Sequence, residues 1–225
     1  MDISHIDNWI FDLDNTLYSG DTQFFSQIDK KITAYISTFL SLNPVDARRI
    51  QKQYLYEYGT SLSGLMREHD MDPDDYLDYV HNIDVSSLTP DPALAEHLAK
   101  LPGRKFIFTN GSRAHAQKVG DHLEIYHLFD GVFGIEDGGY VPKPHRRPYD
   151  DLIAKFAIDP AQAFMAEDMA RNLEIPKQMG MTTLLLASSA DWSHEPARTR
   201  PHTGEAPPDF VDHVTYDLTD WLSRI

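Results

Sequence analysis

The stretch from Trp9 to Leu17 constrains the fold of this chain more than any other. Its first three residues are apolar and lead directly into Asp12 and Asp14, which a short polar turn follows. A short apolar run ending in turn residues indicates a buried strand, and open α/β sheets carry their chemistry at such strand ends. Side chains alternate along a strand, so both carboxylates project to the same side. Two carboxylates on one face need a cation or a shared proton at neutral pH, so the pair implies a metal, a proton-transfer role, or both.

The rest of the chain divides into a helical part and a part in which strands alternate with helices. Apolar residues recur at helical spacing over residues 18–88, where no strand pattern occurs. Within this part, Asp72 is expected to cap a helix whose first residue is Pro73. Alternating strands and helices imply βαβ units and a parallel sheet, into which residues 18–88 are inserted. Strands are predicted at 105–109, 131–134, 163–166, 182–186 and 210–214, and helices at 91–101, 114–123, 148–156, 171–179 and 218–225.

Composition limits the classes of partner. A net charge of −15 argues against a nucleic-acid polymer or an anionic membrane, while a small anionic substrate would need a local positive site or a metal. The absence of cysteine excludes a disulfide framework, a thiolate zinc site and a cysteine nucleophile. The eleven histidines include no helical pair suited to zinc and are expected at the surface or in the core. We find no signal peptide and no apolar run near the length of a membrane span, and expect a cytoplasmic monomer or homodimer.

Four strings, each at or just after a predicted strand, carry a family resemblance. Residues 12–16, Asp-Leu-Asp-Asn-Thr, resemble motif I of the haloacid dehalogenase-like (HAD) phosphohydrolases, of form DxDxT. Thr109 ends a hydrophobic strand as in motif II, Lys143 lies between two prolines as in motif III, and Glu167-Asp168 resembles the metal-binding motif IV. Taken singly, these strings also suit an Asp-rich turn, an ordinary strand end or a solvated lysine. Their common order indicates the HAD family.

The resemblance implies both the fold and the domains. It predicts an α/β core with a Rossmann-like parallel sheet, the HAD fold, formed by residues 1–17 and 89–225. Residues 18–88 would form an inserted helical cap of the C1 type, which closes over the active site and expels water.

The resemblance also implies a Mg²⁺-dependent phosphomonoester hydrolase. Asp12 would be the nucleophile that forms an aspartyl-phosphate, and Asp14 would act as general acid and then as general base. Lys143 would neutralise the nucleophile and the phosphoryl oxygens. The remaining roles implied are phosphoryl binding for Thr109 and Asn110, Mg²⁺ binding for Asp12, the Asp14 backbone carbonyl and Asp168, and support for Glu167 and Asn172.

Further strings are similar to the pyrimidine 5′-nucleotidase branch of the family. They are residues 14–18, 56–60, 64–65 and 171–174. This similarity makes Tyr18, Tyr58 and Thr60 candidates to contact a base or a sugar, although the cap tyrosines could instead pack between helices. The alternatives are a broad phosphatase of small metabolites such as phosphoglycolate or sugar phosphates, and a HAD-fold binding protein without activity. Residues 188–208 are expected to form a long exposed loop, either a surface excursion or an element of substrate binding or dimerisation.

Overall fold

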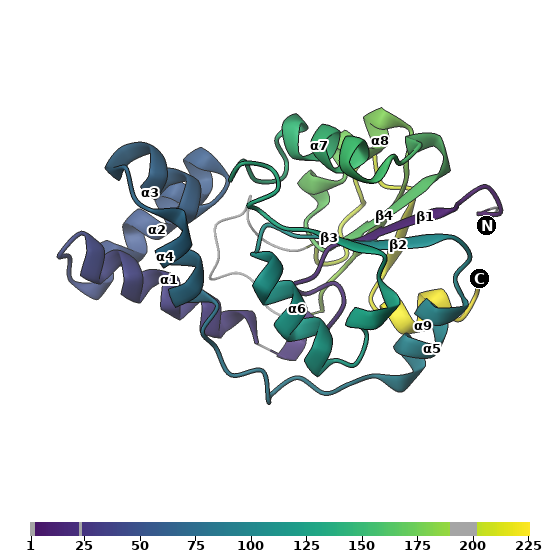
Figure 1. Ribbon diagram of the computed structural model, residues 1–225, viewed down its shortest axis with the longest axis horizontal. Helices are drawn as coiled ribbons and strands as arrows, with labels where there is room; N and C mark the ends of the chain where they lie inside the picture. Colours follow the sequence, from purple (N-terminus) through teal and green to yellow (C-terminus); the bar gives the residue numbers. More distant parts are fainter. Residues whose placement is uncertain (1–2, 23, 190–201) are drawn as a thin grey trace.

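The computed structural model describes residues 3–22, 24–189 and 202–225, and within these ranges six strands form one parallel sheet. Their order is β3-β2-β1-β4-β5-β6, so β1 lies inside the sheet with β2 on one side and β4 on the other (Figure 1). The α/β class and the parallel sheet predicted from the sequence are confirmed. The strands are β1 (Asn8–Phe11), β2 (Arg104–Phe108), β3 (Gly131–Phe133), β4 (Ala163–Glu167), β5 (Thr182–Leu186) and β6 (His213–Thr215).

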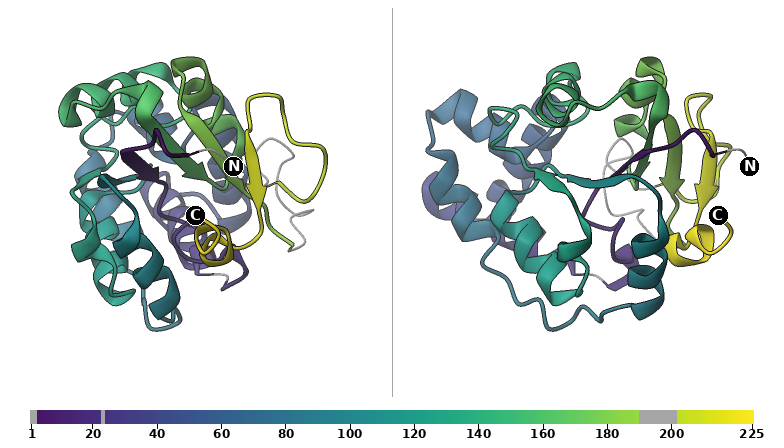
Figure 2. Two further views of the ribbon diagram at one scale, coloured as in Figure 1. Left: turned by 90° about the vertical axis from the view of Figure 1, so that its right-hand side faces the viewer. Right: turned by 45° about the vertical axis from the view of Figure 1, so that its right-hand side comes forward.

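Helices cover both faces of the sheet, and all four residues of β1 are buried as a result. On one face lie α5 (Pro92–Lys100), α6 (Arg113–His122) and α9 (Leu218–Leu222), and on the other lie α7 (Arg146–Phe156) and α8 (Glu174–Met179) (Figures 1 and 2). Alternate residues of β1 enter different cores: Trp9 and Phe11 pack on the α5/α6/α9 face, whereas Ile10 packs against α7.

Two predicted boundaries are wrong for identifiable reasons. The helix expected over 171–179 divides into a 3₁₀ turn, Ala170–Asn172, and α8. Pro176 has no N–H to bond the carbonyl of Asn172, and that carbonyl accepts the Tyr149 hydroxyl instead, at 2.8 Å. The strand expected over 210–214 begins only at β6. Before it, Thr183 Oγ1 donates to the Phe210 carbonyl at 2.8 Å, so a side chain replaces the main-chain ladder.

The inserted helices form a block with a hydrophobic core of its own. They are α1 (Phe25–Phe39), α2 (Pro44–Tyr58), α3 (Ser61–His69) and α4 (Pro73–Val80). Asp72 caps α4 as predicted, its carboxylate accepting from Asp74 N at 3.0 Å. Gly64 lets α3 approach α2, because a Cβ there would overlap the ring of Tyr54. The separate core supports a cap domain over residues 18–88, a division that stays a prediction; Tyr18, Phe24 and Ile28 pack into the core of the sheet instead.

Among the described residues, no helix combines the length and apolarity needed to cross a membrane. Residues 190–201 of the predicted 188–208 loop lie outside the described residues, so both roles considered for that loop stay predictions. Short 3₁₀ turns complete the fold at Gly20–Thr22, Tyr126–Leu128 and Pro160–Gln162.

Candidate active site

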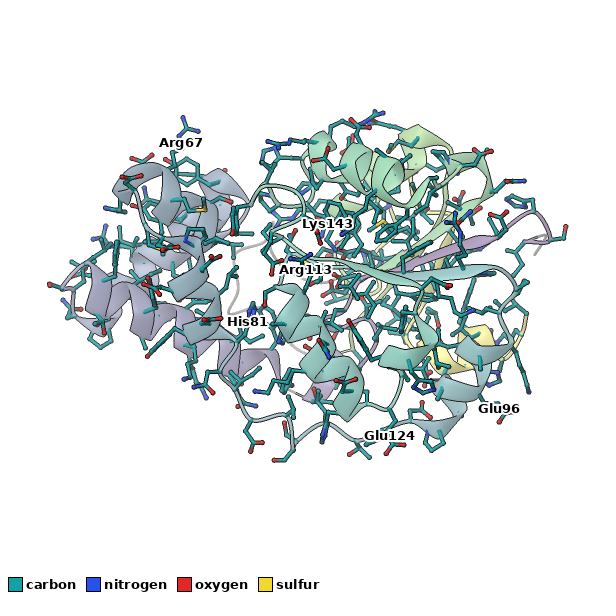
Figure 3. All side chains as sticks on the ribbon, in the orientation of Figure 1. Arg67, His81, Glu96, Arg113, Glu124 and Lys143 are labelled. Atoms are coloured by element: carbon teal, nitrogen blue, oxygen red, sulfur yellow. The ribbon has the colours of Figure 1, made fainter. Side chains whose placement is uncertain are left out.

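The carboxyl ends of the central strands bring the four motif regions together. Asp12 follows β1, Thr109 follows β2, and Glu167 and Asp168 lie at the end of β4. Since β2 and β4 flank β1 in parallel register, these ends meet at one edge of the sheet. Lys143 reaches the same edge from the loop between β3 and α7, and Figure 3 places it on the side that faces the helical block.

Lys143 is the centre of the buried hydrogen-bond network. Its Nζ donates to Asp12 Oδ1 and to Glu167 Oε1, each at 2.7 Å, and to the Phe108 carbonyl at 2.9 Å. These three bonds use all three donors of the ammonium group, whose residue is only 1% exposed. Burial lowers the pKa of Lys143, but the charges and hydrogen bonds of the two carboxylates outweigh it and hold that pKa above its ordinary value. Lys143 is therefore a fixed positive charge beside Asp12.

Asn110 holds the main chain that carries this lysine. Its Oδ1 accepts from Lys143 N at 2.8 Å, and its Nδ2 donates to the Lys143 carbonyl at 3.3 Å. Thr109 is buried, and its Oγ1 accepts from Gly111 N at 2.8 Å. The structure thus gives Asn110 a supporting contact, while phosphoryl binding by Thr109 and Asn110 stays a prediction.

Three buried carboxylates meet beside Lys143. Ligand-type oxygens of Asp12, Glu167 and Asp168 lie within 4.8 Å of one another. Burial raises the pKa of Asp12 to about 7 in spite of Lys143. Burial, and then the charges of Glu167 and Asp12, raise the pKa of Asp168 well above its ordinary value. Around one ammonium, three ionised carboxylates would leave two uncompensated negative charges, which a divalent cation matches.

Glu167 differs from the other two carboxylates because it accepts three hydrogen bonds among the described residues, whereas Asp12 accepts two and Asp168 accepts one. Oε1 accepts from Lys143 and, at 2.6 Å, from Asn172 Nδ2, while Oε2 accepts from Met169 N at 2.8 Å. Although burial raises its pKa, Lys143 and these hydrogen bonds lower it below the ordinary value. Asp12 and Asp168 carry fewer bonds, so their oxygens are better available to a hard cation such as Mg²⁺.

Asp14 occupies a separate environment two residues after Asp12. Oδ1 of Asp14 accepts from the Tyr18 hydroxyl at 2.7 Å, and His115 Nε2 lies 2.9 Å from the same oxygen. Burial raises the pKa of Asp14, but the neighbouring His115 and the hydrogen bonds from His115 and Tyr18 bring it below its ordinary value. Asp12 thus lies in the cluster with Glu167 and Asp168, whereas Asp14 lies beside donors that stabilise its charge.

Comparison with known proteins identifies the family. Residues 6–180 match the family model described as haloacid dehalogenase-like hydrolase. The chain belongs to this family. The chain is also 29% identical to Phosphate metabolism protein 8 of Saccharomyces cerevisiae over 192 residues, covering 77% of this chain and 59% of that protein. This HAD-like hydrolase therefore spans less than two thirds of the length of that relative.

Solved structures share the fold of this HAD-like hydrolase. A HAD phosphatase from Thermococcus onnurineus superimposes with a TM-score of 0.64 at 16% identity, over 97% of both chains. L-2-haloacid dehalogenase from Xanthobacter autotrophicus gives a TM-score of 0.59 at 21% identity, also over 97% of both chains. The fold alone therefore accommodates both phosphatases and dehalogenases.

Two of the residues predicted to contact substrate make contacts within the helical block of this HAD-like hydrolase. The Tyr58 hydroxyl donates to Glu68 Oε1 at 2.7 Å, and Thr60 Oγ1 caps α3 by accepting from Ser63 N at 3.1 Å. The turn between them nevertheless lies close to the loop that carries Lys143. A Cβ placed on Gly59 would be only 3.3 Å from Pro142 Cγ. With φ at +85°, Gly59 adopts a conformation that favours glycine. Substrate contacts by Tyr18, Tyr58 and Thr60 stay predictions.

Sequence reasoning gave no role to His115, which contacts Asp14 although 101 residues separate them. One signal was present in the sequence: His115 and Val119 are one helical turn apart, so His115 lies on the buried face of α6. His81, which follows α4, stacks on the His115 ring with centroids 4.3 Å apart. Periodicity could place His115 inside the protein but could not name Asp14 as its partner.

Proposed function

We propose that this chain is a Mg²⁺-dependent phosphomonoester hydrolase that acts through an aspartyl-phosphate on Asp12. The observation that carries the proposal is the 2.7 Å contact between Lys143 Nζ and Asp12 Oδ1 at the edge of a buried acidic cluster. This contact fixes the orientation of the nucleophile and supplies one positive charge, and the remaining negative charge calls for a divalent cation. The phosphate-related name of the yeast relative supports the same class of substrate.

The chemistry of the donor set fits Mg²⁺. Carboxylate and carbonyl oxygens are its preferred ligands, and the carboxylates of Asp12 and Asp168 with the Asp14 backbone carbonyl would hold the ion. When bound, Mg²⁺ supplies the positive charge that lets an anionic phosphate approach Asp12. Glu167 would support the site through Lys143 and Asn172, to which it is hydrogen-bonded.

The residues of the chain divide the reaction into two steps. Asp12 attacks phosphorus, forming a new P–O bond while the ester P–O bond breaks. Asp14, in the fraction of molecules in which it is protonated, gives this proton to the leaving oxygen, and then takes a proton from the water that cleaves the aspartyl-phosphate. Lys143 and the Thr109 hydroxyl would bind the phosphoryl oxygens, whose charge is spread over the transition state.

Asp14 favours phosphate chemistry over cleavage of a carbon–halogen bond. A halide leaves without a proton, whereas an alkoxide leaving group needs one. A second carboxylate held by Tyr18 and His115 beside the nucleophile suits the second kind of leaving group. The likeness to dehalogenases in fold does not change this choice, because the chemistry depends on the site.

For the substrate, we propose a pyrimidine 5′-mononucleotide, with residues 18–88 as a cap that closes over it. The position of Gly59 against the Lys143 loop supports a cap turn at the mouth of the site. A broad phosphatase of small metabolites remains the second candidate, since the polar groups of Tyr58 and Thr60 are occupied by bonds within the helical block.

Phosphate release from purified protein tests both candidates. UMP, CMP, dTMP, AMP, GMP, phosphoglycolate and sugar phosphates would be compared with Mg²⁺, using Asp12→Asn and EDTA as controls. We expect a preference for UMP, CMP or dTMP that both controls abolish. Equal or sugar-phosphate activity with the same control results would retain the mechanism and replace the substrate. Absence of release from every compound would refute the hydrolase proposal.

A further inference from the structure

Both hydrogen bonds to the Asp14 carboxylate among the described residues end on the same oxygen. An ionised carboxylate only accepts, so the Tyr18 hydroxyl and the Nε2–H of His115 both donate to Oδ1. This requirement places a proton on Nε2 of His115. Oδ1 is thereby anchored from two directions, and Oδ2 is the oxygen that remains for a transferred proton. The Asp14 side chain keeps 14% of its surface exposed, which leaves room for such a transfer.

The ring of His115 is itself held firmly. His115 N donates to Ser112 Oγ at the start of α6, at 3.1 Å. The His81 ring lies parallel to it, with 13° between the planes, and its Nδ1 is 3.0 Å from the same Ser112 Oγ. Gly111 makes space for this pair, since a Cβ there would lie 3.1 Å from Cδ2 of His115. Figure 3 places His81 where the helical block meets α6, so the support for His115 comes from both parts of the molecule.

An unsatisfied atom indicates what the His115 ring is placed for. Its Nδ1 is buried and has no hydrogen-bond partner among the described residues, whereas Nε2 meets Asp14. A buried polar atom without a partner costs about 1–3 kcal/mol, and such exceptions in native structures call for an explanation. A histidine required only for packing could be replaced by an apolar residue without that cost. The contact with Asp14 accounts for its presence.

We propose that His115 is a positioning residue for the proton-transfer carboxylate Asp14, and that the stacked His81 fixes the His115 ring from the side of the helical block. This inference rests on the proposed phosphatase function. His115 does not contact the reacting atoms; it keeps Asp14 oriented so that Oδ2, once it carries a proton, can give that proton to the leaving oxygen. Loss of His115 should therefore lower activity most on substrates whose leaving group most needs that proton.

Two aryl phosphates of similar size test this dependence. Phenolate is strongly basic and benefits from protonation, whereas p-nitrophenolate leaves readily without it. In His115→Leu, we expect kcat/KM for phenyl phosphate to fall about 30-fold and that for p-nitrophenyl phosphate to fall less than about 3-fold. The ratio kcat/KM is the suitable quantity because it reports the transfer of the phosphoryl group to Asp12 and not the later hydrolysis. His81→Leu should give the same pattern with a smaller loss.

Two further variants separate positioning from structural damage. His115→Gln retains an N–H donor at the end of its side chain and should recover most of the activity on phenyl phosphate. His122→Gln lies on the same helix and alters a contact with the 81–91 connection, where His122 Nε2 is 2.9 Å from the Leu88 carbonyl, but it leaves Asp14 untouched and should behave as wild type. Equal losses on both aryl phosphates, or a Gln variant as impaired as the Leu variant, would overturn the positioning role.

The failure of the proposed function has a different signature. A wild-type protein that releases no phosphate from the two aryl phosphates, the nucleotides, phosphoglycolate or the sugar phosphates refutes the phosphatase function, and the positioning role with it. An active wild type whose Leu variant loses both activities equally refutes positioning alone. A measurement without turnover completes the test: the ring Nε2–H resonance of His115 in an ¹⁵N-labelled sample should shift in Asp14→Ala. An unshifted resonance would show that the two side chains do not interact in solution.

Discussion

Nζ of Lys143 lies 2.7 Å from Oδ1 of Asp12, and the same nitrogen lies 2.7 Å from Oε1 of Glu167. One cation therefore compensates two buried carboxylates, and Asp12 shares its only buried ammonium partner among the described residues with Glu167, which holds the end of β4. Under the proposed function, catalysis and folding would depend on the same contact.

Replacing Lys143 should lower both the activity and the stability of the protein. Lys143→Met leaves Asp12 and Glu167 buried without a counter-charge, which we expect to lower the free energy of unfolding of the metal-free protein by about 3–5 kcal/mol. Phosphate release should fall at least about 100-fold. Urea denaturation and the phosphate assay measure the two effects. Lys155→Met, which removes an exposed ion pair with Asp137, should cost no more than about 1 kcal/mol; similar losses in both variants would contradict this view of Lys143.

The raised pKa of Asp12 makes the metal-free protein less stable at higher pH. The pKa is about 7 in the folded state against an ordinary value of 3.8, so near neutrality the folded state holds a proton that the unfolded state has lost. The stability that this proton contributes is lost as the pH rises through about 7. From about pH 6.5 to about pH 8.5, the Asp12 contribution should fall by about 1 kcal/mol. Urea denaturation in EDTA measures it.

The contributions of other ionisable groups must be separated from that of Asp12 in this pH range. Glu167 and Asp14 have lowered pKa values and stay ionised throughout. The pKa of His81 is lowered from 6.5 to about 3 by burial and by His115, so His81 makes the protein more stable as the pH rises through 6.5, which is opposite to the effect of Asp12. Asp168, whose pKa is also raised, contributes in the same direction as Asp12. The control is therefore Asp12→Asn, whose stability should lack only the pH dependence that Asp12 contributes. Identical pH dependence in the two proteins would exclude a raised pKa of Asp12.

Tyr18 should affect turnover and not substrate affinity. Its hydroxyl donates to Asp14 Oδ1, so Tyr18→Phe removes one of the two hydrogen bonds that anchor Asp14, the proposed proton-transfer group. We expect kcat to fall about 10-fold, the equivalent of one hydrogen bond to a charged group, with KM unchanged. Steady-state kinetics on UMP measure both constants. A raised KM with normal kcat would instead place Tyr18 against the base or sugar, as the family resemblance implies, and Tyr58→Phe offers the parallel test within the cap.

Gly64 should be required for the packing of the helical block. In Gly64→Ala the new methyl group would overlap the ring of Tyr54, and overpacking of this kind costs about 1–3 kcal/mol. Gly120→Ala is the matched change in α6, where the added Cβ would lie 3.1 Å from Tyr126 Cβ, and the gain in helix propensity, about 1 kcal/mol, should offset much of the crowding. Thermal unfolding compares them. A Gly64→Ala variant at least as stable as wild type would show that α2 and α3 separate easily.

The parallel sheet and its polar strand ends could be predicted because they depend on local pattern. Apolar runs marked β1, β2 and β4, and the residues directly after them, Asp12, Thr109 and Asp168, meet at one edge of the sheet because parallel strands end together. Lys143 could be recognised only by resemblance, since nothing local distinguishes it from a solvated lysine. Its 131-residue separation from Asp12 is closed by the fold and not by the sequence nearby.

The missed features depend on contacts between distant segments. His115 reaches Asp14, and His81 reaches His115, across the junction of the helical block and α6. The shortened strand β6 likewise follows from hydrogen bonds of Thr183 with Phe210 and Asp212, which no periodicity reveals. The pKa values of Asp12 and Asp168 are raised by shared burial, a property of the assembled cluster.

The interior position of β1 has a kinetic consequence. Hydrogen bonds to β2 and β4 hold it on both sides, and the amide of Asp12 itself donates to the Ala166 carbonyl at 3.0 Å. Amides in such strands exchange with solvent deuterium only when the molecule opens globally. Asp12, the proposed nucleophile, should thus lie on the slowest-exchanging backbone of the protein, which would keep its carboxylate in place while substrate binds and leaves.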